Sequence, residues 1–225
     1  MVNIYPDTQS RALAIIDVLR KVTKDMQKPG AVEIIKVYGK DPFLVLVSCI
    51  LSLRTKDTVS VSASKRLFEH ARKPHELMRL SLLEIQKLIY PVGFYRQKAQ
   101  QLVELSARIV HHFNGVVPCG ESDLLSLPGV GRKTMNLVQA EGFGMPALCV
   151  DTHVHRISNR LRLVQTSTPQ ETEYALKALL PQAYWIEYSR LLVTWGQNIC
   201  TPTLPHCSVC PLAPVCPQIG VIRKR

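Results

Sequence analysis

Apolar residues recur at the spacing of a helix face along almost the whole chain, and this pattern constrains the fold most. A first helix is expected to end near Pro29, and another is expected over residues 31–38. Residues 42–53 are apolar all round, as in a helix at the centre of a bundle. No run alternates apolar and polar residues as a half-buried strand would. The sequence therefore predicts an all-α fold.

Side chains that commonly cap helices mark where later helices begin. Asp57, Ser81 and Asp151 each precede a stretch of helical spacing, and Thr168 precedes a proline at the first helical position. The helix after Asp151 is expected to bury its apolar face. Its opposite face is expected to present three arginines outward: Arg156, Arg160 and Arg162.

The chain is basic, with a formal net charge of +11 over 225 residues. Such a balance favours a polyanionic partner through counterion release, although charge alone also fits a basic protein with no nucleic-acid role. The first 26 residues do not resemble a signal peptide, and residues 42–53 are too few to span a bilayer. We therefore expect a soluble, cytoplasmic protein with no membrane partner.

Four of the seven cysteines fall within 17 residues near the end of the chain, with the spacing C-x6-C-x2-C-x5-C. Thiolates this close in a proline-rich loop can surround one compact metal centre, and the irregular spacing favours a [4Fe–4S] cluster. A structural zinc ion and four unrelated buried cysteines remain alternatives. The candidate ligands are Cys200, Cys207, Cys210 and Cys216.

A short turn over residues 127–131, Leu-Pro-Gly-Val-Gly, precedes another helix. Gly129 and Gly131 permit backbone angles that a Cβ atom would forbid, and N–H groups before a helix can converge on an anion. Lys133 lies in the first turn of that helix, and Asp151 follows 18 positions later. The stretch predicts a DNA-phosphate clamp with an amine nucleophile and its carboxylate partner.

Together these features resemble the endonuclease III family of DNA glycosylases, part of the helix-hairpin-helix superfamily. The resemblance rests on LPGVGRKT at 127–134, on VDTHVHRISNRL at 150–161 and on the cysteine spacing at 200–216. Weaker matches are LSLRTKD at 51–57 and YPVGFYRQKA at 90–99.

The resemblance implies a helix-hairpin-helix DNA glycosylase fold with two helical domains that flank a DNA-binding cleft. One is a six-helix domain over residues 38–145. The other is a discontinuous iron–sulfur cluster domain that joins residues 1–37 to 146–225.

The resemblance also implies a role for each matching residue. Lys133 is expected to attack the deoxyribose and Asp151 to assist, so that the protein is a bifunctional DNA glycosylase with AP lyase activity. Its substrate would be double-stranded DNA with an oxidised pyrimidine such as thymine glycol, or an abasic site, and the protein is expected to be a monomer. The remaining DNA-binding candidates are Arg54, Phe94, Gly129, Val130, Gly131, Arg132 and His153.

Three positions depart from the family pattern. Relatives commonly have glutamine at the Arg54 position and leucine at the Phe94 position, so the lesion range and the opposite-base preference stay open. Relatives also place Lys or Arg between the first two cysteines, where this chain has only His206 as a polar donor besides threonines. We expect a weaker contribution of this loop to DNA affinity, with Arg132 and Arg156 compensating.

Three alternatives remain: two other glycosylases and one protein of a different functional class. A monofunctional mismatch adenine glycosylase lacks the hairpin lysine and has a further C-terminal domain, and a mismatch thymine glycosylase has tyrosine in place of the lysine. A non-catalytic iron–sulfur DNA-binding protein would keep the hairpin and the cysteines. It would have no reason to keep both Lys133 and Asp151.

Overall fold

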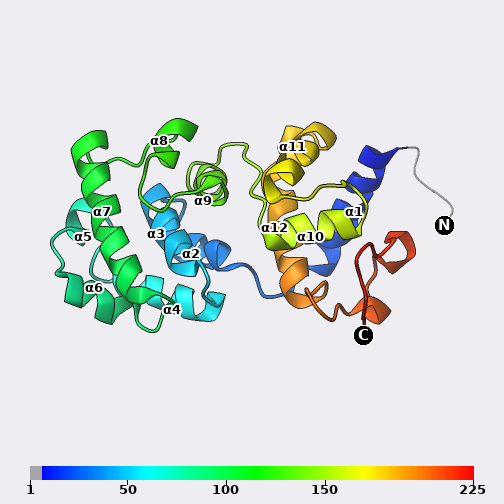
Figure 1. The fold of residues 1–225 in the computed structure, drawn as a ribbon, viewed down its shortest axis with the longest axis horizontal. Helices are drawn as coiled ribbons and strands as arrows, with labels where there is room; N and C mark the ends of the chain where they lie inside the picture. The colour runs from blue at the N-terminus through cyan, green and yellow to red at the C-terminus, as the bar shows by residue number, and fades with distance from the viewer. Residues whose placement is uncertain (1–6) are drawn as a thin grey trace. The chain divides into compact units, whose positions relative to one another are not determined.

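Helices joined by turns and loops make up the computed structural model, which describes residues 7–225 and contains no strand within them (Figure 1). The all-α prediction is confirmed. The chain divides into two units: a middle unit, Pro29–Ala147, and a terminal unit, which joins the residues up to Lys28 to Leu148–Arg225. No helix among the described residues is long and apolar enough to cross a membrane.

The middle unit contains eight α-helices and one π-helical turn within the described chain. They are α2 (Gly30–Tyr38), α3 (Pro42–Ser52), α4 (Asp57–Phe68), α5 (Pro74–Leu77), α6 (Leu82–Ile89), α7 (Tyr95–Phe113), α8 (Glu121–Leu125), α9 (Arg132–Leu137) and the π-helix η1 (Val138–Gly142).

Helix α3 is the centre of the middle unit, as its uninterrupted apolar sequence predicted. Every residue from Phe43 to Leu51 is buried, and α2, α4, α9 and η1 pack around it. The helix begins where the Asp41 carboxylate accepts hydrogen bonds from the Phe43 and Leu44 N–H groups. Burial on all sides makes α3 the fixed element against which the other helices are placed.

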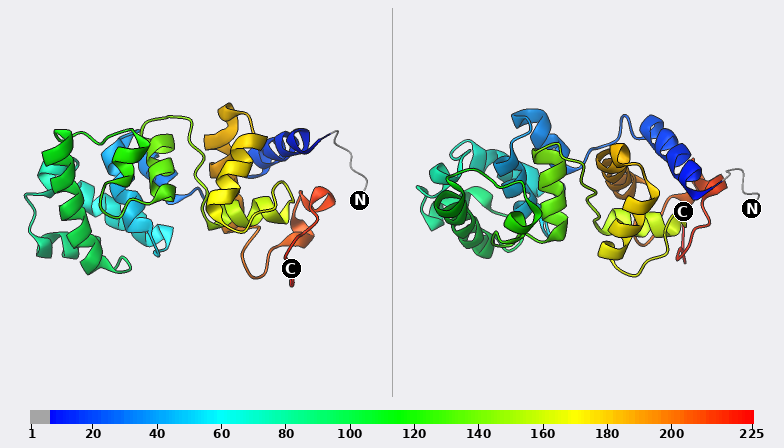
Figure 2. Two further views of the ribbon diagram at one scale, coloured as in Figure 1. Left: turned by 45° about the horizontal axis from the view of Figure 1, so that its top comes forward. Right: turned by 90° about the horizontal axis from the view of Figure 1, so that it is seen from above.

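The terminal unit brings together segments from both ends of the described chain (Figure 2). Its elements are α1 (Thr8–Val22), α10 (Thr152–Arg160), α11 (Pro169–Leu179), the 3-10 turn η2 (Gln182–Tyr184), α12 (Trp185–Asn198) and the 3-10 turns η3 (Cys207–Val209) and η4 (Ala213–Val215). Tyr188 and Trp195 of α12 are the largest side chains in its core.

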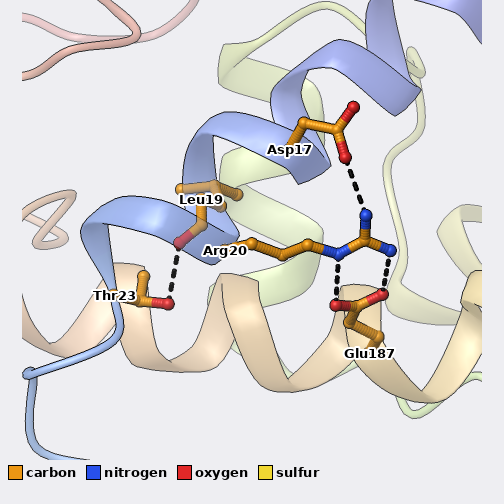
Figure 3. A network of polar contacts seen from close by, with 5 residues as sticks. All are labelled: Asp17, Leu19, Arg20, Thr23 and Glu187. Carbon is orange, nitrogen blue, oxygen red and sulfur yellow. Dashed lines mark hydrogen bonds and ion pairs between the residues drawn. The ribbon is translucent and has the colours of Figure 1, made fainter.

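An ion-pair network on the surface links α1 to α12 (Figure 3). The Arg20 guanidinium donates two hydrogen bonds of 2.6 Å to the Glu187 carboxylate and one of 2.7 Å to Asp17. All three side chains are at least one-third exposed, so solvent screens the pairs and their effect on stability is small. The apolar face of α1 therefore provides most of its attachment.

Two helix ends differ from the sequence predictions. Helix α1 ends at Val22, not near Pro29. The Lys28 ammonium donates to the Thr23 carbonyl, an acceptor that a further helical turn would use. Asp57 does not cap α4; its carboxylate accepts the Gly30 N–H at 2.9 Å, at the start of α2.

The boundary between the units also differs from the predicted one. The sequence analysis placed all but the last residue of α2 in the cluster domain, whereas α2 belongs to the middle unit. It packs on α3 and α4, and the bond from Gly30 to Asp57 fixes its first turn. The apolar face of an isolated helix does not reveal which core it joins.

Candidate functional site

The sequence predicted backbone angles that only glycine adopts easily at both glycines of the turn between α8 and α9. The structure has such an angle at one of them. Gly129 has a φ of 73°, which a side chain would strain, whereas Gly131 has an ordinary φ of −97°. Gly131 precedes α9 without a side-chain cap, and open space surrounds its Cα. Val130 is buried and its N–H donates to the Leu127 carbonyl. The turn is thus anchored by Val130 and exposed at both glycines.

Lys133 lies in the first turn of α9 and is half-buried. The next two residues, Thr134 and Met135, are buried, and the Cys49 thiol of α3 contacts the Thr134 hydroxyl at 3.7 Å. A Cβ at Gly142 would come within 2.8 Å of the Pro42 backbone, so η1 also lies directly on the start of α3. The helix that presents Lys133 is therefore fixed to the centre of the middle unit.

Arg132 precedes Lys133 and forms an ion pair with Glu121 at 3.2 Å. Glu121 is the first residue of α8, so the pair joins both sides of the hairpin. A guanidinium at this place, with its five N–H donors, suits the binding of an anion.

Asp151 caps α10 in the terminal unit, as its sequence predicted. Its Oδ1 accepts hydrogen bonds from the His153 N–H at 2.8 Å and from the Val154 N–H at 2.9 Å. Only one oxygen is used by the cap, and the side chain is half-buried rather than enclosed. The second carboxylate oxygen is therefore compatible with a chemical role in addition to the cap.

His153 is packed against α12. Its Nδ1 lies 3.1 Å from the Arg156 guanidinium, and a Cβ at Gly196 would come within 2.4 Å of the same nitrogen. The glycine in α12 thus makes room for the ring. This environment gives His153 a structural role, and its contact with DNA stays a prediction.

Arg54 and Phe94 lie side by side on the middle unit, although they come from separate loops. Both have left-handed backbones, with φ of 52° and 58°, and both are exposed, with 57% of Phe94 accessible. The Arg54 guanidinium stacks 5.8 Å from the centre of the Phe94 ring. A left-handed conformation costs a residue with a side chain about 1–3 kcal/mol, so the surrounding structure has to impose it.

Of the three arginines that were predicted to point outward from α10, one is buried and another is half-buried. Arg160 is only 7% exposed and donates to the carbonyls of Thr201 at 2.7 Å and Pro202 at 2.6 Å. Arg156 is half-buried, which lowers its pKa, and it donates to the Cys200 carbonyl at 2.7 Å. Both arginines hold the cysteine loop to α10, while Arg162 is exposed. Arg156 and Arg160 were predicted to point outward because charged side chains are rarely buried.

The four cysteines of the C-terminal loop line one pocket, together with Arg160 and Trp195 among its other walls. All four thiols are free, and the Cys200 sulfur lies 3.4 Å from the Arg160 guanidinium. Within residues 7–225, no three His, Cys, Asp or Glu side chains are close enough to hold a metal ion as they stand. Burial raises the pKa of Cys210 to about 11 and also raises that of Cys216.

This donor set nevertheless suits a thiolate-bound metal centre. Burial disfavours thiolates unless a positive charge compensates them, and a metal centre supplies that charge. Four thiols around one pocket are thus donors that a bound metal ion would complement. His206 lies in the same loop, and its N–H donates to the Ile199 carbonyl at 3.0 Å.

Sequence reasoning missed Lys98 and Thr55, which lie beneath Arg54 and Phe94. Lys98 is 5% exposed, and its ammonium donates to backbone oxygens of the loop that contains Arg54. A signal was present: Lys98 shares the apolar helical line of Leu102 and Leu105, where a lysine is unusual.

Comparisons with known proteins agree with these features. Residues 47–182 match the model of the HhH-GPD superfamily base excision DNA repair proteins. Endonuclease III of Thermotoga maritima is 51% identical over 170 residues, which are 76% of this chain and 80% of that protein. The chloroplastic endonuclease III homolog 2 of Arabidopsis thaliana is 40% identical over 185 residues, and this chain spans about half of its length.

Among solved structures, a trapped endonuclease III–DNA covalent intermediate matches with a TM-score of 0.83 and 33% identity. The match covers 93% of this chain and 96% of that one. The chain therefore belongs to the HhH-GPD superfamily of base excision DNA repair proteins and, within it, to the endonuclease III family of bifunctional DNA glycosylases with AP lyase activity.

Proposed function

We propose that this enzyme removes oxidised pyrimidines such as thymine glycol from double-stranded DNA, with Lys133 as the nucleophile and Asp151 as its partner. The observation that supports this most is the place of Lys133, in the first turn of α9 directly after the exposed glycine turn. A mismatch glycosylase of either kind considered above would have another residue there. The family membership supports the same reaction.

The reaction needs an uncharged amine at the reacting sugar. The Lys133 Nζ forms a bond to C1′ while the bond from C1′ to the base breaks, and the base departs with the bonding electrons and takes up a proton. Loss of the second amine proton leaves an imine between Lys133 and the opened sugar. A proton then leaves C2′ and the bond from C3′ to the phosphate oxygen breaks, which nicks the strand. Water finally hydrolyses the imine and releases the enzyme.

Asp151 stabilises the positive charge that develops on the sugar as the base departs. A carboxylate is suited to this, and it can also accept the amine proton directly or through water. The hydrogen bonds at Oδ1 from His153 and Val154 fix its orientation without occupying the other oxygen. Its cap and its chemistry are therefore compatible.

A base inside a duplex has to leave the stack before Lys133 reaches its sugar, and the gap has to be filled. Arg54 and Phe94 fill it in our proposal, since they are exposed, adjacent and on rigid turns. Phe94 supplies an apolar wedge, and the Arg54 guanidinium can stack and donate hydrogen bonds to the unpaired base. Gly129, Gly131 and Arg132 would hold the phosphate backbone.

The cysteine loop would hold a [4Fe–4S] cluster through Cys200, Cys207, Cys210 and Cys216. When bound, the cluster supplies a rigid covalent junction for a loop that has only short 3-10 turns of its own. Arg156 and Arg160 attach that loop to α10, the helix that begins at Asp151. We propose that the protein acts as a monomer inside the cell, where genomic DNA is its substrate.

Borohydride trapping tests the central assignment. The purified protein is mixed with duplex DNA that contains thymine glycol or an abasic site, and borohydride reduces any imine to a stable adduct. We expect an adduct with the wild-type protein and none with Lys133→Gln, while the exposed-lysine control Lys87→Gln retains it. Failure of the wild-type protein to form an adduct on either substrate would refute the lyase assignment.

A further inference from the structure

Lys98 is a buried cation in the middle unit to which the reaction assigns no role. It lies one turn into α7 and is 5% exposed, and burial lowers its pKa to about 8. A lysine on the core face of a helix has to satisfy its ammonium group within the protein. The partners that it finds are therefore informative.

All three partners lie close to Arg54 in the chain, from the last turn of α3 to Thr55. The Lys98 Nζ donates to the Leu51 carbonyl at 3.0 Å, to the Leu53 carbonyl at 2.5 Å and to the Thr55 hydroxyl at 3.3 Å. An ammonium group has three N–H donors, and each has one acceptor here. The bonds lie on both sides of Arg54, whose backbone is left-handed.

Thr55 extends the same set of bonds to the second loop. Its Oγ accepts the Gly93 N–H at 3.1 Å as well as the Lys98 bond, and it donates to the Leu53 carbonyl at 3.3 Å. Gly93 immediately precedes Phe94. A Cβ at Gly93 would lie 2.9 Å from the Arg54 carbonyl oxygen, so only glycine allows the two loops to approach this closely.

We propose that Lys98 and Thr55 are positioning residues that lock the two loops into one preformed wedge. Lys98 fixes the turn around Arg54, and Thr55 fastens that turn to the backbone just before Phe94. The lock imposes the two left-handed conformations and keeps the side chains stacked on each other before DNA is bound. This inference rests on the proposed role of Arg54 and Phe94 in extrusion.

The lock itself can be tested without DNA. Thr55→Val removes the hydroxyl and keeps the shape of the side chain, and Thr55→Ser keeps the hydroxyl. Hydrogen–deuterium exchange of the free protein should be about tenfold faster in peptides that cover 51–55 and 91–95 for Thr55→Val and Lys98→Met. Thr55→Ser and the exposed-lysine control Lys87→Met should match the wild type. Unchanged exchange in Thr55→Val would overturn the proposal, even if Lys98→Met fails to fold.

Two substrates then separate extrusion from chemistry. Excision of thymine glycol from a duplex, measured in a single turnover, should be about tenfold slower in Thr55→Val and Lys98→Met. Imine formation at an abasic site in single-stranded DNA needs no extrusion and should stay within about twofold of the wild type.

The two experiments distinguish the inference from the proposed function. Equal losses on both substrates would mean that the residues support the fold in general, which would overturn the positioning role. A wild-type protein that forms no adduct would instead refute the proposed function, and the exchange measurement would still decide whether the lock exists.

Discussion

Each unit holds an irregular loop in place with a buried cation that donates to backbone carbonyls, but the two cations differ. In the middle unit the Lys98 ammonium holds the turn around Arg54, and in the terminal unit the Arg160 guanidinium holds the start of the cysteine loop. Lysine loses its proton readily when buried, whereas arginine stays charged. The wedge thus depends on a titratable brace, and the cysteine loop depends on a permanent one.

The largest effect is expected for Asp151, which precedes α10, the helix that ends at the brace Arg160. Asp151→Asn keeps an oxygen that can accept the cap hydrogen bonds but removes the negative charge. We expect single-turnover excision of thymine glycol to slow by about 100-fold or more, because charge stabilisation at the sugar is lost. The melting temperature should change by no more than about 2 °C. An unchanged rate would show that Asp151 is only a cap.

The next largest effect is expected for Arg160→Met, which removes a buried guanidinium from the wall of the cysteine pocket. It removes the donors from the partly buried carbonyl bonds of Thr201 and Pro202, which costs about 1–3 kcal/mol in the free energy of unfolding. Urea unfolding followed by tryptophan fluorescence measures this. Arg162→Met, which changes an exposed arginine two positions later, is the matched control and should unfold like the wild type. Equal stability of both variants would contradict the brace.

The pH dependence of stability should reveal that the Lys98 brace is titratable. The pKa of Lys98 lies at about 8 in the folded protein and at its ordinary value of 10.5 when unfolded. The unfolded state therefore binds more protons between these values, so Lys98 makes the free energy of unfolding rise with pH from about 8 to 10.5. The difference between the wild type and Lys98→Met should grow across this window.

The matched comparison is the difference between the wild type and Arg162→Met, an exposed arginine, which should stay constant over the same pH range. A constant difference for Lys98→Met would show that Lys98 has an ordinary pKa in the folded state.

The smallest effect is expected for the exposed pair between α1 and α12. Arg20→Met should lower the melting temperature only slightly at low salt, and 1 M sodium chloride should remove the difference from the wild type. A large, salt-independent loss would mean that this surface network contributes like the buried braces.

Features determined by neighbouring residues could be predicted from the sequence. The buried α3, the caps at Ser81, Asp151 and Thr168 and the place of Lys133 follow from spacing and local hydrogen bonding, and the structure has them where expected. The helical fold is likewise a consequence of local pattern.

Features determined by distant backbone could not be predicted. Asp57 bonds to Gly30, 27 positions away, and Arg160 turns inward because carbonyls 41 and 42 positions away need donors. Lys98 similarly reaches carbonyls more than 40 positions away. A long or charged side chain chooses its partner only once the fold has placed the available backbone groups.

The pairing of α1 with α12 has a consequence for the order of folding during synthesis. The middle unit is one continuous stretch of chain, so it can fold as soon as its own residues have left the ribosome. The terminal unit needs α12, and the bond from Arg20 to Glu187 closes 167 residues of chain. Helix α1 is made before the middle unit, and it therefore remains without its partner until that unit and α12 have been synthesised.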